Sequence, residues 1–346
     1  MSRRPNLLSL WFVAGVAVVS STDSGHAFSE SARPPADCFG QEATIVGTPG
    51  TELLEGTAGP DVILTNGVLE VDARGGDDLV CVTGDAPPEG VFVLLGRGAD
   101  QLLGHPSGDD YVYADDENRG EIDRDIIDTG GGDDYVAIGS EKRGAGASQD
   151  WIEFGTGRDH LNLRGAVSLA ATLSGGTDRD LIYWGAIAPR GVGVAIDNAH
   201  EELRLDGQDV MEWDSFEIFR ALPGIQGPFT FRGSDQGETL GGPVFFVDDR
   251  WKVDVRMGGG RDWVAVTGAG RGSQIDGGRG ADRLMTQSLE TLVVRGGMTM
   301  YGRAGNDRLI GSQQGDRLLG GPGHDIADGR EGSDRCMAEV RTRCES

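Results

Sequence analysis

The sequence lacks the short motifs that mark the common catalytic and cofactor sites. Its histidines at positions 105, 160, 200 and 324 form no HExxH pair, and the chain contains neither a GxSxG element nor a P-loop. No CxxC spacing occurs, so a thiolate metal site is not indicated. Carboxylates are abundant instead, with 56 Asp and Glu residues. A carboxylate pair for sugar chemistry is therefore neither located nor excluded by the sequence.

Positive charge is also in short supply. Lys and Arg together number 31, which leaves a formal net charge of −25 at pH 7. Nucleic acid is a poor candidate partner, because binding a polyanion requires a basic face. A chain this acidic, in which only 38% of residues are hydrophobic, is either disordered or stabilised by bound cations.

Long hydrophobic runs are absent except for one near the N-terminus, from Leu7 to Val19. This run is shorter than the roughly 20 residues that a membrane-spanning helix needs. Arg3 and Arg4 precede it and Gly25-His26-Ala27 follows, which predicts a signal peptide at 1–27 cleaved before Phe28. We expect a secreted, extracellular protein with no membrane span in its mature form. Export by the Sec route is expected, with the twin-arginine route as the alternative.

Cysteine occurs at only four positions, which allows three pairings. Proximity favours Cys336 with Cys344 and leaves Cys38 with Cys81. In an exported protein we expect these pairs to be structural disulfides rather than metal thiolates.

Glycine, by contrast, is abundant and periodic, with 58 residues. From Gly302 to Met337 four blocks of nine follow one another: GRAGNDRLI, GSQQGDRLL, GGPGHDIAD and GREGSDRCM. Each block has Gly first and Asp sixth, at Asp307, Asp316, Asp325 and Asp334. Related Gly-Asp turns place further candidate ligands at Asp61, Asp78, Asp100, Asp134, Asp159, Asp180, Asp262 and Asp282. The repeat predicts a coiled chain, with two turns per coil at the ends and one per longer coil in the middle.

Short β-branched and aromatic runs separate the turns, such as VFVLL at 91–95 and WVAV at 263–266, and these predict strands. In the last four blocks a three-residue strand follows each Asp. Its middle residue should point inward: Leu309, Leu318, Ala327 and Cys336. One inward side chain per nine residues is a thin core, too little to offset the entropy of ordering the chain.

Bound calcium would supply the stabilisation that this thin core lacks. Stacked strands lie about 4.8 Å apart, and two calcium–oxygen bonds of roughly 2.3 to 2.6 Å span the same distance. Glycine permits the positive φ that aims carbonyls inward, and the short Asp side chain reaches a cation beside its own backbone. Without a cation, stacked carboxylates would repel one another and the C-terminal repeats should be disordered.

Two copies fit the pattern GGxGxD: Gly277, Gly278, Gly280 and Asp282, and Gly320, Gly321, Gly323 and Asp325. Other copies depart from it, with Arg303 and Arg330 at the second place, Gln314 at the fourth, and Glu52 and Glu238 in place of Asp. The pattern resembles the hemolysin-type (RTX) calcium-binding repeat of secreted bacterial proteins. This resemblance implies an all-β, right-handed parallel β-solenoid (β-roll or β-helix) that binds several calcium ions in its GGxGxD turns.

In that family's geometry, turns one coil of eighteen residues apart share a calcium ion. The resemblance therefore implies that Asp307 pairs with Asp325 and Asp316 with Asp334. It implies carbonyl ligands from Gly302, Gly305, Gly320, Gly321 and Gly323.

These patterns divide the chain into six parts. They are the signal peptide (1–27), an N-terminal segment (28–46), an RTX-like solenoid (47–184), an aromatic-richer segment continuing the solenoid (185–260), an RTX-like β-roll (261–337) and a disulfide-closed tail (338–346). Within the aromatic-richer segment, 198–220 could be argued as helical, but Gly207 and Asp209 interrupt it. Its aromatic residues are interpreted as core, with a carbohydrate-stacking surface as the alternative.

We expect a non-enzymatic calcium-binding solenoid that folds on meeting extracellular calcium and acts as a structural or surface-binding module, with extracellular polysaccharide or a cell surface as candidate partner. The alternative is a polysaccharide-active lyase, epimerase or hydrolase on a β-helix, with its groove at 185–260. A third hypothesis, a type I secretion tail, is disfavoured by the N-terminal signal and the terminal cysteine pair. The sequence leaves the oligomeric state open.

Overall fold

The computed structural model describes residues 37–85, 90–115, 123–140, 147–165, 168–185, 190–221, 225–246, 249–287, 294 and 296–345. The expected signal peptide at 1–27 lies outside these residues. Across the described residues all regular structure is β-strand and no helix occurs. The same residues accordingly contain no helix long and apolar enough to cross a membrane.

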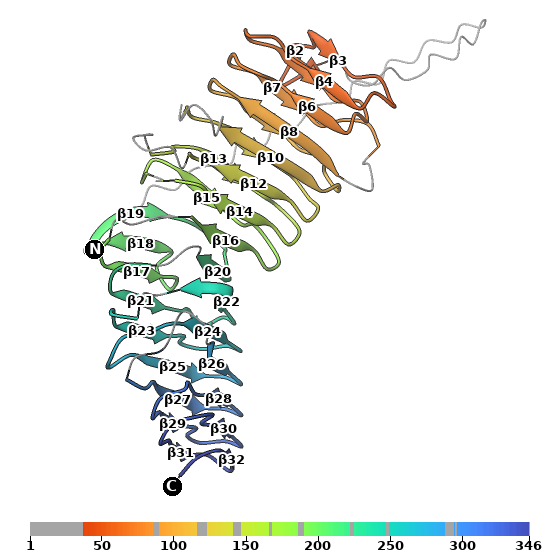
Figure 1. Ribbon diagram of the computed structural model, residues 1–346. Helices are drawn as coiled ribbons and strands as arrows, with labels where there is room; N and C mark the ends of the chain where they lie inside the picture. Colours follow the sequence, from red (N-terminus) through yellow and green to blue (C-terminus); the bar gives the residue numbers. More distant parts are fainter. Residues whose placement is uncertain are drawn as a thin grey trace, which may run out of the picture. The chain divides into compact units, whose positions relative to one another are not determined.

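Most strands belong to three sheets of stacked strands (Figure 1). The long sheet contains β4 (Leu53–Glu55), β6 (Glu70–Asp72), β8 (Val91–Gly96), β10 (Asp110–Asp115), β12 (Tyr135–Ile138), β14 (His160–Leu163), β16 (Leu181–Trp184), β20 (Ile218–Ala221), β22 (Thr239–Phe246), β24 (Trp263–Thr267), β26 (Arg283–Gln287), β28 (Arg308–Ile310), β30 (Ile326–Asp328) and β32 (Val340–Thr342).

Two shorter sheets supply the other strand of each coil. The N-terminal sheet contains β3 (Ile45–Val46), β5 (Val62–Leu64), β7 (Leu79–Cys81), β9 (Gln101–Leu103), β11 (Ile126–Asp128), β13 (Trp151–Glu153) and β15 (Thr172–Ser174). The C-terminal sheet contains β17 (Val194–Asp197), β18 (Glu202–Leu205), β19 (Gln208–Glu212), β21 (Phe229–Arg232), β23 (Val253–Arg256), β25 (Gln274–Arg279), β27 (Thr299–Ala304), β29 (Arg317–Leu319) and β31 (Arg335–Met337).

The chain alternates between the long sheet and a shorter sheet, and each strand pairs in parallel with the equivalent strand one coil away. In the C-terminal repeats, for example, Leu309 on β28 aligns with Ala327 on β30, and Leu318 on β29 aligns with Cys336 on β31. This arrangement confirms the predicted parallel β-solenoid. The strands at 308–310, 317–319, 326–328 and 335–337 coincide with the predicted three-residue strands after each Asp.

Antiparallel pairing occurs at two places in the described residues. The strands β1 (Asp37–Cys38) and β2 (Gln41–Glu42) form a hairpin at the N-terminal end. The strands β17, β18 and β19 form an antiparallel meander that joins the C-terminal sheet through β17 and β21. The turn between β18 and β19 contains Asp206 and Gly207, both with positive φ. The helix considered for 198–220 is therefore absent, because this turn reverses the chain.

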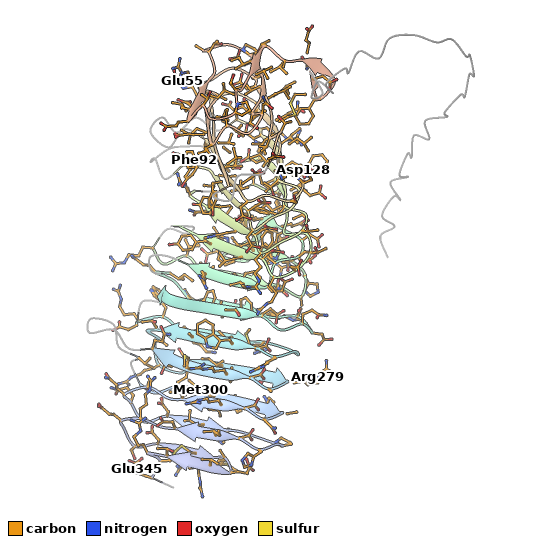
Figure 2. All side chains as sticks on the ribbon, turned by 90° about the vertical axis from the view of Figure 1, so that its right-hand side faces the viewer. Glu55, Phe92, Asp128, Arg279, Met300 and Glu345 are labelled. Carbon is orange, nitrogen blue, oxygen red and sulfur yellow. A yellow bond between two sulfur atoms is a disulfide. The ribbon has the colours of Figure 1, made fainter. Side chains whose placement is uncertain are left out.

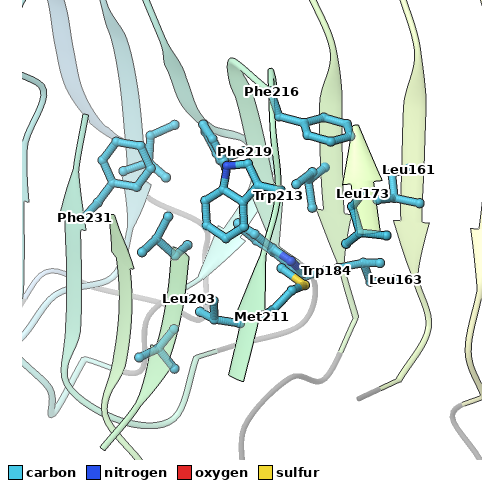
Figure 3. Close-up of a cluster of buried hydrophobic side chains, with 14 of the residues drawn as sticks. Leu161, Leu163, Leu173, Trp184, Leu203, Met211, Trp213, Phe216, Phe219 and Phe231 are labelled. Atoms are coloured by element: carbon cyan, nitrogen blue, oxygen red, sulfur yellow. The ribbon is translucent and has the colours of Figure 1, made fainter. Parts of the chain in front are cut away.

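The hydrophobic core runs between the sheets and its composition changes along the chain. In the last four repeats the predicted inward residues Leu309, Leu318 and Ala327 are fully buried and Cys336 is 3% exposed. The aromatic-richer segment instead buries large rings, which are shown in Figure 3: Trp184, Trp213, Phe216, Phe219 and Phe231. These rings pack against one another, with centroids 5.8 Å apart for Trp184 and Phe219. They are core, which excludes them as a carbohydrate-stacking surface.

Both predicted disulfides are present. Cys38 and Cys81 join the N-terminal hairpin to β7 in a small buried cluster with Val62, Leu64 and Leu79. Cys336 and Cys344 tie the chain end to β31. Each bond therefore closes one end of the stack, where a terminal coil has a neighbour on one side only.

Candidate metal-binding ladders

A carboxylate that precedes a strand accepts a hydrogen bond from the backbone N–H of the equivalent residue one coil earlier. The backbone N–H of Asp282 donates to Asp307 Oδ1 at 2.9 Å, and the N–H of Asp307 donates to Asp325 Oδ1 at 2.9 Å. Repeated along the long sheet, this contact forms what we call the long ladder. Its members are Asp110, Asp134, Asp159, Asp180 and Glu217, and then Glu238, Asp262, Asp282, Asp307, Asp325 and Glu339.

Two further ladders precede the strands of the shorter sheets. The N-terminal ladder consists of Asp61, Asp78, Asp100, Asp125 and Asp150. The C-terminal ladder consists of Asp316, Asp334 and Glu345, the last of which lies at the chain end (Figure 2). A cavity of about 500 Å³, lined in part by Met298, Asp316, Asp334 and Glu345, opens beside the C-terminal ladder.

The ladder aspartates and Glu238 are buried, whereas Glu217 is partly exposed and Glu339 and Glu345 are exposed. Most of the buried carboxylates use only one of their two oxygens. Asp307 and Asp325 are 2% and 0% exposed, yet Oδ2 of each has no hydrogen-bond partner within the described part of the chain. The ladder carboxylates with such an oxygen are Asp78, Asp100, Asp110, Asp134, Asp159, Asp180, Glu238, Asp262, Asp282, Asp307, Asp325 and Asp334. Buried polar atoms almost always have partners, so a column of unpartnered carboxylate oxygens fits the binding of a cation.

The first glycine of each C-terminal turn makes room beside this oxygen. A Cβ on Gly277 would lie 2.5 Å from Asp282 Oδ2 and 3.0 Å from the carbonyl oxygen of Gly302. On Gly302 it would overlap Asp307 Oδ2 and lie 2.7 Å from the carbonyl oxygen of Gly320. The space that a methyl group would fill is thus bordered by a carboxylate oxygen of one coil and a carbonyl oxygen of the next. Both are ligand types that calcium prefers.

The second and fourth positions have positive φ in three of the four C-terminal turns, and the exception is GSQQGD, with Ser312 and Gln314 there. In the GGPGHD turn Gly321 has φ +114° and Gly323 has φ +154°. A Cβ on Gly323 would collide with the carbonyl oxygen of Gly305 one coil earlier, so the two turns stack backbone on backbone.

The arginines at the second position keep the same backbone conformation as glycine. Arg303 has φ +78° and Arg330 has φ +70°. Arg303 forms a two-pronged ion pair with Asp276, with Nη2 2.6 Å from Oδ2, and Arg330 Nη1 donates to the carbonyl oxygen of Thr286. These contacts stabilise a conformation that is unfavourable for a side chain.

Burial raises the pKa of several ladder carboxyls, among them Asp100, Asp134, Asp180 and Asp262, and the neighbouring carboxylates raise it further. The pKa of Asp134 and Asp262 rises to about 8, and that of Asp100 and Asp180 to about 7. A carboxyl with such a pKa holds its proton near neutral pH unless a cation replaces the proton. The ladders therefore provide oxygen-only sites whose charge a hard divalent cation would neutralise.

The second Asp of the middle turns has a different role. Asp77 and Asp133 are exposed, and each accepts a backbone N–H from the following coil: Asp77 from Ala99 and Asp133 from Arg158. Asp109 accepts the N–H of Asp133 in the same way. These side chains cap the outside of the turns rather than join the buried ladders.

The structure brings the predicted partners together. Asp307 lies next to Asp325, and the N–H of Asp316 donates to Asp334 Oδ1 at 2.7 Å, so the eighteen-residue pairing holds. Asp61 and Asp316 differ from the other predicted ligands. The N–H of Thr57 donates to Asp61 Oδ2, and the backbone and hydroxyl of Ser312 both donate to Asp316. The protein itself therefore partners the carboxylate oxygens at these two turns.

Sequence reasoning did not identify Asp125, Asp150, Glu217, Glu339 and Glu345 as ladder members. It recognised Asp110 in a Gly-Asp turn and Glu238 in place of Asp, but selected neither as a candidate ligand. Asp125 follows DR and Asp150 follows SQ, neither of them in a GGxGxD turn, and the glutamates break the Asp rule. Their positions follow only from strand register, since each directly precedes a paired strand or ends the chain.

The comparisons with known proteins agree with this geometry. The family model for the "RTX calcium-binding nonapeptide repeat (4 copies)" matches residues 46–67 and 301–336. No curated protein sequence gives a significant match to the chain. The matched stretches contain Asp61 and all four aspartates of the C-terminal blocks. The chain therefore carries hemolysin-type RTX calcium-binding repeats, and its stacked turns form a calcium-binding structural module.

Proposed function

We propose that this protein is a secreted solenoid that folds on binding several calcium ions outside the cell and then serves as a rigid, non-catalytic surface-binding module. The observation that carries the proposal is the column of buried carboxylates with one unpartnered oxygen each, such as Asp282, Asp307 and Asp325. Calcium binding would supply the missing partner and remove the repulsion between coils. Two disulfides suit an oxidising, extracellular setting.

The ligands proposed are the twelve aspartates predicted from the sequence, joined by Asp110 and Glu238. The unpartnered oxygens of Asp307 and Asp325 would bind together with stacked carbonyls, among them those of Gly302, Gly305, Gly320, Gly321 and Gly323. Asp61 and Asp316 would contribute less, because their oxygens already accept protein hydrogen bonds.

Calcium titration of metal-stripped protein tests the proposal. Isothermal calorimetry should report several bound ions, and circular dichroism should report a gain of β-structure over the same calcium range. Asp325→Asn should lower the number of bound ions. The matched control is Asp209→Asn, which removes a surface ion pair with Arg204 outside the ladders and their turns. An unchanged spectrum on adding calcium, or on chelating it, would contradict the proposal.

The second candidate, a polysaccharide-active enzyme, rests on a cavity of about 290 Å³ on the C-terminal sheet. It is lined by Asp197, Arg204, Arg232, Asp254 and Arg256, among others. Burial alone would raise the pKa of Asp254, but hydrogen bonds from Gln274 and Lys252 outweigh burial and lower it. Asp254 therefore stays ionised and is poorly suited to donate a proton to a glycosidic oxygen. We favour the non-catalytic function for this reason.

A further inference from the structure

Residues 338–345, which follow β31 and which we call the tail, lie against the last coil of the solenoid. Strand β32 of the tail pairs in parallel with β30, and the N–H of Glu345 donates to the carbonyl oxygen of Asp334 at 3.1 Å. Figure 1 shows β31 and β32 at the C-terminal end of the stack. The family match ends at residue 336, and the tail contains no glycine. The stack is therefore closed by chain that is not a repeat.

The tail continues both ladders of the C-terminal repeats by one carboxylate each. The N–H of Asp325 donates to Glu339 Oε2 at 2.7 Å, and the N–H of Asp334 donates to Glu345 Oε2. Within the repeats the same contact is made to an aspartate of the next coil. Glutamate thus takes the ladder position of aspartate where the repeats have ended.

The tail also replaces the backbone oxygen that borders each glycine of the repeats. A Cβ on Gly311 would overlap Asp316 Oδ2 and lie 2.7 Å from the carbonyl oxygen of Gly329, the first glycine one coil later. A Cβ on Gly329 would overlap Asp334 Oδ2 and the carbonyl oxygen of Arg343. The carbonyl of Arg343 therefore lies where the first glycine of a further turn would place its own.

Two acceptor oxygens consequently face one space at the end of the stack. Asp334 is 1% exposed, and its Oδ2 has no hydrogen-bond partner among the described residues. The cavity of about 500 Å³ beside the C-terminal ladder is lined by Asp334 and Glu345 together. A buried carboxylate oxygen beside a carbonyl oxygen is unfavourable unless a cation lies between them, and calcium prefers both types of ligand.

The second disulfide connects the two sides of this space. Cys336 follows Asp334 by two residues and is an inward residue of the core, 3% exposed. Cys344 stands between Arg343 and Glu345 in the sequence and packs against the same core. The bond between the two cysteines therefore fixes the tail oxygens relative to the buried carboxylate.

Other contacts hold the tail more weakly. All three residues of β32 are exposed, and Arg341 occupies the register position of the buried residue Ala327. The tail therefore buries little apolar area. Arg343 pairs with Asp328, with Nε 2.8 Å from Oδ1, but the arginine side chain is 56% exposed and such pairs contribute little to stability. The disulfide is thus the main constraint on where the tail oxygens lie.

We propose that the tail completes a terminal calcium site and that the Cys336–Cys344 disulfide sets the affinity of this site. Its ligands are Asp334 Oδ2, the carbonyl oxygen of Arg343 and the carboxylate of Glu345. Calcium takes six to eight oxygen ligands, and water can supply the others at an exposed chain end. The inference rests on the calcium binding of the proposed function. It adds a site outside the repeats and makes that site dependent on an oxidised cysteine pair.

The test is calcium titration of the metal-stripped full chain by isothermal calorimetry, after circular dichroism in calcium has established that each variant is folded. The double variant Cys336→Ala/Cys344→Ala should bind at least one calcium ion about 10- to 100-fold more weakly than the wild type. Hydrogen exchange at limiting calcium should place the loss of protection in residues 329–345. The matched control is Cys38→Ala/Cys81→Ala, which removes the disulfide at the other end and should leave this site unchanged.

Gly329→Ala tests the same site with the disulfide intact. The added methyl group should weaken binding by about 10- to 100-fold, and it should cause no further loss in the Cys336→Ala/Cys344→Ala background, because both changes act on one site. Gly59→Ala, where a methyl group meets no atom within 4 Å, is its control. Glu345→Gln should weaken binding by about 3- to 10-fold, whereas Glu212→Gln, at an exposed position of β19, should have no effect.

The outcomes separate this inference from the proposed function. If the wild type binds several calcium ions and the cysteine and glycine variants bind all of them as tightly, the terminal site is refuted and the proposed function stands. If the chain binds one ion that depends on the disulfide but gains no β-structure, the proposed function is refuted and the terminal site stands. A wild type that binds no calcium refutes both.

Discussion

The C-terminal repeats and the aromatic-richer segment share one architecture but are stabilised differently. Between 301 and 337 each coil buries small or aliphatic residues, such as Leu309 and Ala327, and carries a carboxylate in both of its turns. Near β20 and β21 the core holds Phe219 and Phe231, and only the long ladder passes through these coils. We therefore expect bound ions and buried apolar area to substitute for each other along the same stack.

This difference indicates which coils should depend most on calcium for their stability. A coil that buries aromatic rings gains enough from the hydrophobic effect to stay ordered with few ligands. A coil of nine-residue turns gains little, so we expect its order to depend on cations between the coils. The glutamates at 217 and 238 stand in the long ladder next to the aromatic core, where the demand for a well-formed calcium site is smallest.

Chelation should produce the largest difference between the two regions. With excess EDTA, amide protection in 301–345 should fall by about 100-fold or more, as expected when a ligand at 100 times its dissociation constant is removed. Protection in β20 and β21 should fall far less. Hydrogen exchange with mass spectrometry measures both regions in one sample. Equal loss of protection throughout would refute the regional difference.

Phe219→Ala should destabilise the aromatic core without changing calcium binding. Phe219 is fully buried and contacts Trp184 and Phe231, so its truncation should cost about 3–5 kcal/mol of stability. The number of bound calcium ions should stay unchanged, because the ladder residues are intact. Thermal unfolding and calcium calorimetry on the same variant provide the two readouts. A lower calcium count would show that the aromatic core and the ladders are not independent.

Gly302→Ala should weaken calcium binding at one site of the C-terminal repeats. The added methyl group would overlap Asp307 Oδ2 and approach the carbonyl oxygen of Gly320. We expect about a 10- to 100-fold loss of affinity at that site, with the aromatic-richer segment unaffected. Gly59→Ala is the control, since a methyl group there meets no atom within 4 Å. Similar affinities for the two variants would argue against a site beside Gly302.

The pH dependence should have opposite signs without and with calcium. The pKa of Asp134 and Asp262 is raised from 3.8 to about 8 in the folded protein. Calcium-free protein therefore binds more protons when folded, and its stability should be greatest below about pH 4 and fall as pH rises towards 8. With calcium, stability should rise over the same range because deprotonated ligands bind the ion. Melting temperatures at pH 5 and 8 should differ by about 5 °C in opposite directions.

Local patterns in the sequence were sufficient for much of the candidate site. The position of Asp after glycine turns predicted Asp307, Asp316, Asp325 and Asp334, and a uniform nine-residue period predicted which of them stack. Cysteine proximity predicted both disulfides. These features depend on short-range geometry. A repeat of constant length reproduces that geometry in every coil.

The middle ladders could not be predicted in the same way. There the separation between stacked carboxylates varies, from 17 residues between Asp61 and Asp78 to 37 between Asp180 and Glu217. Because loops of different length separate the strands, sequence distance no longer gives spatial distance. Asp125 and Asp150 therefore gave no signal, although they continue the ladder from Asp100.

The sequence by itself determined the parallel solenoid, the calcium-type turns and the ends closed by disulfides, because glycine φ preferences, Asp side-chain length and nine-residue periodicity act locally. Only the tertiary structure decided which carboxylate oxygens stay unpartnered, that Ser312 satisfies Asp316, and that aromatic rings from five strands of the long sheet contact one another. Those features arise from contacts between coils. Interstrand register sets these contacts, and hydrogen bonds between distant residues fix that register.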